Sequence, residues 1–168
     1  MSDAKAISEH FLKSEPEQWA ETMKTNIGAG YYMSMAFLPQ LAKGKDVTPG
    51  YTSSVINVSS ISGSMKGSSN GQFAYATSKA AFSHLSRMLA TTFADTKVRV
   101  NVIAPGIFPS EMTAGESGED NKSKLDMQPS NPAKRPGHDT DMGATVLFLA
   151  GPGGVFYNEQ FLYPDGGK

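Results

Sequence analysis

Apolar positions recur along the chain in two patterns, one typical of helices and the other typical of short buried strands. Apolar side chains at helical spacing predict helices over residues 14–42, 72–94 and 139–150. Short apolar runs rich in β-branched residues predict strands over residues 55–59, 98–104 and 160–163. The polar residues 1–13 show no strand pattern.

The order of these elements, with helices between successive strands, indicates an α/β fold. Strands joined in this way pair in parallel through right-handed crossovers, which places helices on both faces of the sheet. We therefore predict a parallel sheet of about three strands in a chain, residues 1–168, that is a single domain by size. Because three strands make a narrow sheet, the strand at 55–59 or its neighbour should keep an open edge.

Individual residues mark where the helices begin and end. Ser14-x-x-Glu17 has the spacing of a capping box, and Pro16 suits a first helical turn because its missing N–H would have no partner there. Asp139 or Thr140 should cap the last helix, which ends at Gly151-Pro152. The loop at residues 107–137 is long and polar, which is typical of a lid or a binding loop.

Asn26, Gly28 and Gly30 place three poor helix formers within five residues of the first predicted helix. Such a group indicates either a close packing contact or a local distortion that frees a backbone carbonyl. Both alternatives stay open on the sequence alone.

Composition excludes several classes of function. A net charge of −1 leaves no basic surface for nucleic acid, so small molecules or other protein chains are the expected partners. The chain has no cysteine and its three histidines lie far apart, so we predict no disulfide and no metal site. No apolar run is long enough to cross a bilayer, and we expect a soluble, cytoplasmic protein that binds no membrane.

Tyr75 and Lys79 are candidate catalytic residues, because side chains four apart on a helix share one face. A nearby ammonium favours the phenolate, so the two side chains form a plausible acid–base pair. The spacing alone is weak evidence. Two neighbours strengthen it. Ser59-Ser60 lies at the carboxyl end of one predicted strand and Pro105-Gly106 at the matching end of the next, at the sheet edge where open α/β sheets bind ligands.

Four motifs occur in a characteristic order: Asn57-Val58-Ser59-Ser60-x-x-Gly63, Tyr75-x-Thr77-Ser78-Lys79, Val98-Arg99-Val100-Asn101-x-Ile103-x-Pro105-Gly106 and Asp165-Gly166-Gly167. Together they resemble the short-chain dehydrogenase/reductase family, over the chain from about Phe11 to its end. The resemblance implies the catalytic part of a partial Rossmann-like, doubly wound parallel sheet. It also implies an oxidoreductase that uses NAD or NADP to reduce a small-molecule carbonyl or to oxidise an alcohol.

The resemblance also assigns catalytic roles to individual residues. Tyr75 would be the general acid or base, and Lys79 would bind the nicotinamide ribose and ease the loss of the tyrosine's proton. Ser60 would polarise the substrate oxygen, with Ser62 as the alternative. Asn26 would help to hold a water of the proton relay.

The segment that begins at Pro105-Gly106 would cover the nicotinamide. Ile107 and Ser110 would contact it in addition to Tyr75 and Lys79, and residues 107–137 would form a lid over the substrate. Relatives of this family commonly pair through the two long helices, which implies a homo-oligomer through residues 14–42 and 72–94.

The family's first half, with its Gly-rich turn, is not found in the sequence. Gly28-x-Gly30 lies in a predicted helix and the glycines at 151–154 follow one, so neither forms a phosphate cradle. An alternative function is therefore a truncated, inactive fragment or a protein-interaction module. A third is cofactor-free isomerisation or elimination by Tyr75 and Lys79. The substrate and the choice between NAD and NADP stay open.

Overall fold

The computed structural model describes residues 3–67, 69–115, 117–118, 123, 125 and 130–167. Three parallel strands form its sheet in the order β1 (Ser54–Val58), β2 (Arg99–Ile103) and β3 (Phe161–Leu162). Val58 pairs with Ile103 and Ile103 with Leu162, so the carboxyl ends of the strands are aligned. The predicted three-stranded parallel sheet is confirmed, with each strand within two residues of its expected position.

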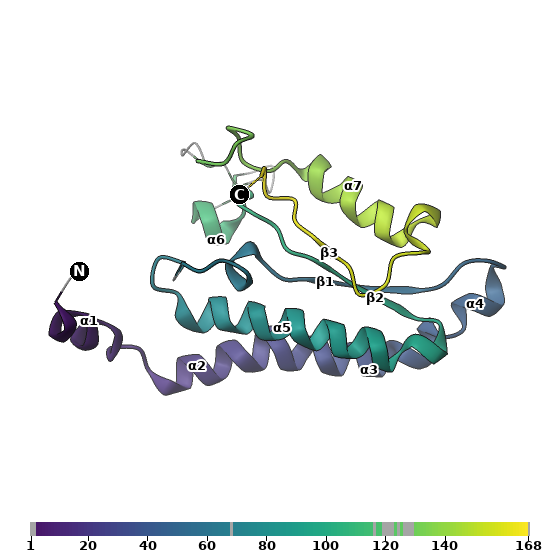
Figure 1. Cartoon of the computed structure of the whole chain (residues 1–168), viewed down its shortest axis with the longest axis horizontal. Coiled ribbons are helices and arrows are strands. Elements are labelled where there is room, and N and C mark those ends of the chain that lie inside the picture. Colours follow the sequence, from purple (N-terminus) through teal and green to yellow (C-terminus); the bar gives the residue numbers. More distant parts are fainter. Residues whose placement is uncertain are drawn as a thin grey trace.

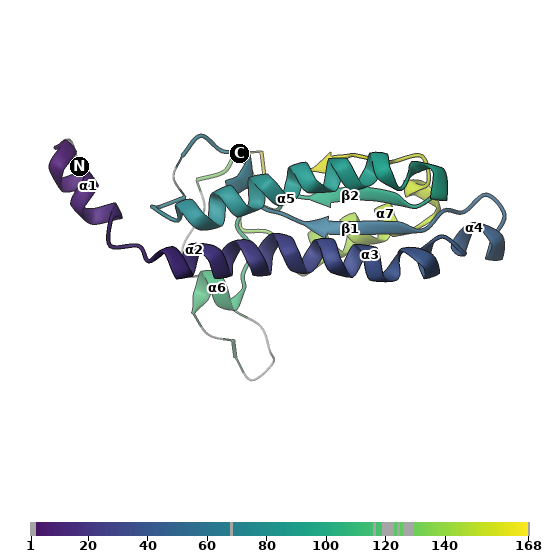
Figure 2. The same ribbon diagram turned by 90° about the horizontal axis from the view of Figure 1, so that it is seen from below.

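Helices cover both faces of the sheet, as predicted (Figure 1). The helices α5 (Phe73–Thr92) and α3 (Ala29–Leu41) lie side by side on one face, and α7 (Asp139–Ala150) lies on the other. The view from below shows α2 (Pro16–Met23) and α3 following one another along α5 (Figure 2). The two long helices were both expected from the apolar spacing.

The hydrophobic core lies between β2 and the carboxyl-terminal half of α5. Leu89, Ala90 and Phe93 pack against Val98 and Val100, and each is at most 2% exposed. Fully burying a side chain such as leucine or phenylalanine stabilises a fold by about 1.5–3 kcal/mol, so this cluster anchors the helix to the sheet.

The beginning of the first long helix differs from the prediction. Glu15 is the N-cap residue of α2 without a side-chain bond, and Pro16 takes the first helical position as expected. Ser14 does not form the predicted capping box, because its Oγ donates to Phe11 O at 2.8 Å. That carbonyl ends α1 (Ala4–Phe11), a helix that the sequence analysis did not predict and that Asp3 caps.

Short helices occupy several of the expected loops. They are α4 (Gly44–Val47), η2 (Ile61–Gly63), η3 (Ala94–Thr96), α6 (Glu111–Ala114) and η4 (Pro152–Gly154). The cap of α7 is His138 rather than Asp139 or Thr140, which lie inside the first turn. Asp141 supplies the side-chain acceptor there, because its Oδ2 accepts the His138 N–H at 2.9 Å.

The strand β1 is less buried than its apolar sequence predicts. Asn57 is buried, but Val58 is 48% exposed, whereas all five residues of β2 are buried. The reason is that β1 lies at the edge of the sheet and pairs only with β2, so the expected open edge is confirmed for the described residues. No helix in the described part of the chain is long and apolar enough to span a membrane.

Candidate active site

The turns that follow β1 and β2 are held together at the carboxyl edge of the sheet. Ser59 N–H donates to Ile103 O at 2.7 Å, and Ile61 N–H donates to Pro105 O at 3.0 Å. The predicted neighbourhood of Ser60 and the Pro105-Gly106 turn is therefore present. Ligands of open α/β sheets bind at this edge.

A row of hydrogen bonds, which we call the polar seam, joins the end of β1 to α5 through Asn57, Ser59, Ser83 and Ser86. Asn57 Nδ2 donates to Ser86 Oγ at 2.8 Å. Ser59 Oγ donates to Lys79 O at 2.9 Å and lies 2.8 Å from Ser83 Oγ. Small polar side chains thus set the distance between the strand and the helix.

The turn η2 contacts α5 directly through Gly63. A Cβ added there would lie 2.7 Å from the Ala80 backbone nitrogen, which is too close for any side chain. Because Gly63 allows this approach, the turn places Ser60 beside the helix that carries Tyr75. Ser60 Oγ accepts the Ser62 N–H at 3.1 Å, so its own hydrogen remains to be donated.

Tyr75 and Lys79 lie one turn apart on α5, as predicted. Lys79 Nζ is 5.7 Å from the centroid of the Tyr75 ring and donates to Val58 O at 3.2 Å. Partial burial lowers the pKa of the Lys79 ammonium below its ordinary value, because the charged form loses hydration. The pair therefore combines a phenol with a cation that is partly withdrawn from water.

Asn26 lies behind this pair, in a π-helical turn (η1, Lys24–Gly28) between α2 and α3. Its Nδ2 donates to Ser78 Oγ at 2.9 Å, and Ser78 Oγ donates to Tyr75 O at 2.7 Å. The Ala29 N–H reaches back five residues to Lys24 O, so the helix is locally widened. The expected distortion at the Asn-Gly patch is present.

The patch also contains the other expected feature, a close packing contact. A Cβ added at Gly30 would collide with the Phe82 ring of α5, whereas one at Gly28 would meet nothing within 4 Å. Gly30 therefore allows α3 to approach α5 closely.

Ser60, Ser62, Tyr75, Gly106 and Ile107 line one open cleft of about 360 Å³. The structure thus brings together the predicted serine, tyrosine and turn, and it leaves both serines at the cleft. Residues that the sequence analysis missed also line it, and they include Met65, Asn70, Gln72 and Met112. A signal existed only for Gln72, which precedes Tyr75 by three residues at the start of the same helix.

The other predicted site residues lie outside this cleft. Asn26 shares a shallow groove with Tyr75. Ser110 is the N-cap of α6, where its Oγ lies 3.1 Å from Thr113 Oγ1, and it lines a neighbouring groove. Of the predicted lid at 107–137, residues 116, 119–122, 124 and 126–129 fall outside the described residues.

Gly151 and Gly154, which were judged unsuitable as parts of a phosphate cradle, lie where a side chain would collide with the backbone. A Cβ at Gly151 would lie 2.7 Å from Leu147 O, and one at Gly154 would lie 2.5 Å from Leu149 O.

Among the described residues, no group of three or more His, Asp or Glu side chains could hold a metal ion.

Arg135 and Asp141 form an ion pair beside the cleft, with Arg135 Nη1 donating to Asp141 Oδ2 at 2.6 Å. Two hydrogen bonds from Arg135 and one from the His138 N–H lower the pKa of Asp141 to about 2. The ordinary pKa of aspartate is about 4, so this carboxylate stabilises the fold above that pH, and its contribution is lost as the pH falls through about 2.

We expect Asp141→Asn to lower the free energy of unfolding at neutral pH, and the difference from the native chain to narrow as the pH falls from about 4 to about 2. Urea unfolding at a series of pH values measures both effects. Asp46→Asn, which removes an exposed aspartate of α4, is the matched control and should cost less at neutral pH. A difference that stays constant across the acidic range would contradict the assignment.

Comparison with known proteins supplies the family. The family model described as Enoyl-(Acyl carrier protein) reductase matches residues 2–168. The chain belongs to the short-chain dehydrogenase/reductase family. A short-chain dehydrogenase/reductase of Diaporthe leptostromiformis, PhomF′, is 34% identical over 156 residues, which cover 92% of this chain and 53% of that protein.

Two further matches, one a curated protein and one a solved structure, come from Pseudomonas aeruginosa. The rhamnolipids biosynthesis 3-oxoacyl-[acyl-carrier-protein] reductase is 33% identical over 157 residues, covering 93% of this chain and 60% of that protein. The structure of the RhlG/NADP active-site complex superposes with a TM-score of 0.74 at 32% identity, covering 90% of this chain and 59% of that one. These matches confirm the Rossmann-like α/β fold. The chain spans little more than half the length of these relatives.

Proposed function

We propose that the chain provides the catalytic part of an NAD(P)(H)-dependent oxidoreductase that reduces a small-molecule carbonyl or oxidises an alcohol. The observation that carries this proposal is the shared cleft of Ser60, Tyr75 and the Gly106–Ile107 turn, with Lys79 Nζ 5.7 Å from the Tyr75 ring. The relatives that match the chain are named as dehydrogenases and reductases, which supports the same chemistry.

The proton is handled by Tyr75. During reduction its hydroxyl donates the proton to the carbonyl oxygen, and during oxidation the phenolate takes it from the alcohol. The Lys79 ammonium favours the phenolate by its charge. Ser60 donates a hydrogen bond to the same substrate oxygen, because its bond with the Ser62 N–H uses the hydroxyl as an acceptor and not as a donor.

The cleft of Ser60, Tyr75 and the Gly106–Ile107 turn supports a site for the reactive end of a nicotinamide cofactor. Lys79 would hold the nicotinamide ribose beside Tyr75, and the Pro105–Ile107 turn would contact the ring, with Ser110 as a further contact. When bound, the cofactor supplies or accepts the hydride. Asn26, which lies in the π-helical turn η1, would help to hold a water of the proton relay. Residues 107–137 would close over the substrate.

Titration calorimetry with NADPH and with NADH tests this function. Micromolar binding of either cofactor by this chain supports the oxidoreductase and also shows which cofactor is used. Millimolar or undetectable binding of both contradicts it and favours the inactive fragment or interaction module. We place the reaction in the cytoplasm, and cell fractionation checks that location.

An interaction surface is favoured by exposed apolar side chains on the two long helices. Tyr32, Met33 and Phe37 on α3 are 72%, 57% and 52% exposed, and Met88 on α5 is 56% exposed. Isolated exposed apolar residues are common, but several on adjoining helices are typical of an interface. We propose a homo-oligomer through these helices, and sedimentation as a monomer at micromolar concentration would contradict it.

A further inference from the structure

The turn Gly106–Ile107, which borders the candidate cleft, is supported from two directions. On one side, Gly106 N–H donates to Pro164 O at 3.1 Å, and a Cβ added at Gly106 would lie 2.7 Å from Asp165 Cα. On the other side, Gly137 N–H donates to Ile107 O at 2.9 Å. The position of the turn therefore depends on the C-terminal turn and on the segment that leads into α7.

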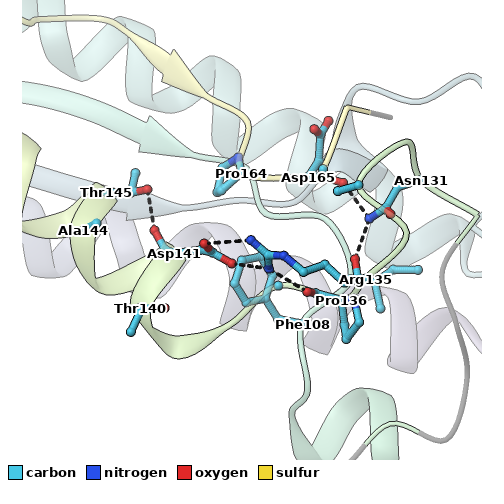
Figure 3. Close-up of a pocket in the computed structure, with 14 residues that line it drawn as sticks. Phe108, Asn131, Arg135, Pro136, Thr140, Asp141, Ala144, Thr145, Pro164 and Asp165 are labelled. Carbon is cyan, nitrogen blue, oxygen red and sulfur yellow. Dashed lines mark hydrogen bonds and ion pairs between the residues drawn. The ribbon is translucent and has the colours of Figure 1, made fainter.

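Asn131 joins these two supports (Figure 3). Its Nδ2 donates to Arg135 O at 2.9 Å and to Asp165 O at 3.2 Å. Ala133 N–H adds a bond to Gly166 O at 3.0 Å. The residue is only 5% exposed, so the bridge is enclosed by protein.

The environment of Asn131 shows what its amide contributes. The Oδ1 atom is buried and has no hydrogen-bond partner among the described residues. An unsatisfied buried acceptor is destabilising. If the side chain at position 131 served only to fill space, an apolar residue of the same size would therefore stabilise the fold more than asparagine. What the amide supplies is the pair of donated bonds. A Cβ at Gly166 would lie 2.5 Å from Asn131 Nδ2, so the two partners fit closely.

We propose that Asn131 is a positioning residue for the cofactor-facing turn Gly106–Ile107, an inference that rests on the proposed oxidoreductase function. Without the amide, the 131–137 segment loses the bond to Asp165 O that ties it to the C-terminal turn and the bond to Arg135 O within the segment, and it keeps the Ala133–Gly166 bond. The two supports of Gly106–Ile107 are then joined more weakly. Asn131 is not part of the cleft lining, so its loss affects the binding of the nicotinamide end rather than proton transfer at Tyr75.

Asn131→Leu keeps a similar side-chain size and removes both donors. We expect the dissociation constant for NADPH to rise about tenfold or more, because small displacements of binding groups carry large costs. The rate at saturating cofactor and the pH profile should stay unchanged. Asn131→Ala is the second variant, for use if Asn131→Leu does not fold. Alanine also removes both donors, and it introduces no new contact.

Thr52→Val is the control for general destabilisation. It removes the hydroxyl that accepts from Arg99 Nε at 2.8 Å, at the opposite end of the strands. This variant should lower stability without changing NADPH affinity. Equal losses of affinity in Thr52→Val and the Asn131 variants would overturn the inference.

Backbone amide exchange gives a readout that does not depend on cofactor. The Gly106 and Gly137 amides should exchange faster in the Asn131 variants, whereas the Val102 amide, which donates to Gln160 O within the sheet, should not. Unchanged exchange at Gly106 and Gly137 overturns the positioning role. If the native chain binds no NADPH, the proposed function fails, and the exchange result still decides the role of Asn131.

Discussion

Tyr75→Phe should abolish carbonyl reduction, lowering turnover by about 10²–10⁴-fold, the usual contribution of a positioned general acid or base. The phenyl ring keeps the packing of Tyr75 but has no proton to give to the substrate oxygen. Lys79 Nζ, 5.7 Å from the ring, then has no phenolate to stabilise. Oxidation of NADPH in the presence of a panel of aldehydes and ketones measures the loss.

Tyr51→Phe is the matched control for this substitution. The Tyr51 hydroxyl donates to Ala150 O at 2.9 Å, at the end of α7, and lines none of the grooves that contain Tyr75. Its loss should cost some stability and leave turnover intact. An unchanged rate in Tyr75→Phe would remove Tyr75 from the mechanism, and retained NADPH binding in that variant would show that the fold is preserved.

Arg99→Leu should cause the largest loss of stability, about 3 kcal/mol or more. Arg99 is 5% exposed at the start of β2. Its guanidinium donates to Leu149 O at 3.1 Å and to Gly154 O at 2.7 Å, which ties the end of α7 to the sheet. Further bonds reach Thr52 Oγ1 and Thr52 O. Leucine would remove all of these donated bonds, and Gly154 O would keep only the Tyr157 N–H, at 2.9 Å, of the two donors named for it.

Thermal unfolding checks this result, with a midpoint about 6–12 °C lower than in the native chain. Arg87→Leu is the control, because Arg87 forms an ion pair with Glu159 in which its side chain is 58% exposed. Exposed pairs contribute about 1 kcal/mol or less, so the control should unfold within a few degrees of the native chain. Equal shifts in the two variants would contradict a special role for Arg99.

The sequence predicted the strands and the long helices because their apolar spacing is repeated over many residues. Errors arose at helix ends, where the choice depends on one or two local bonds. Ser14 has the residue type and spacing of an N-cap, yet its hydroxyl bonds to the end of α1. At α7, Asp141 and His138 replace the predicted Asp139 or Thr140.

The candidate site was predictable where motif and topology agree. Ser60, Tyr75 and Gly106–Ile107 meet because aligned parallel strands end together and α5 crosses that edge. Asn131 left no signal in the sequence, because its amide reaches Asp165, thirty-four residues away, through a backbone carbonyl that every residue type possesses. The lid at 107–137 and the oligomer stay predictions.

The helix α5 is attached to the sheet in two different ways, by the hydrogen bonds of the polar seam and by apolar contacts. Toward the carboxyl end, Leu89, Ala90 and Phe93 hold the helix by apolar contact, which tolerates small changes of volume. Between Lys79 and Ser86, the side chains of Asn57 and Ser59 hold the helix by hydrogen bonds. Substitutions in the apolar core should therefore change the free energy of unfolding without altering the distances between Ser60, Tyr75 and Lys79. Stability and reaction geometry can then vary separately within a single helix.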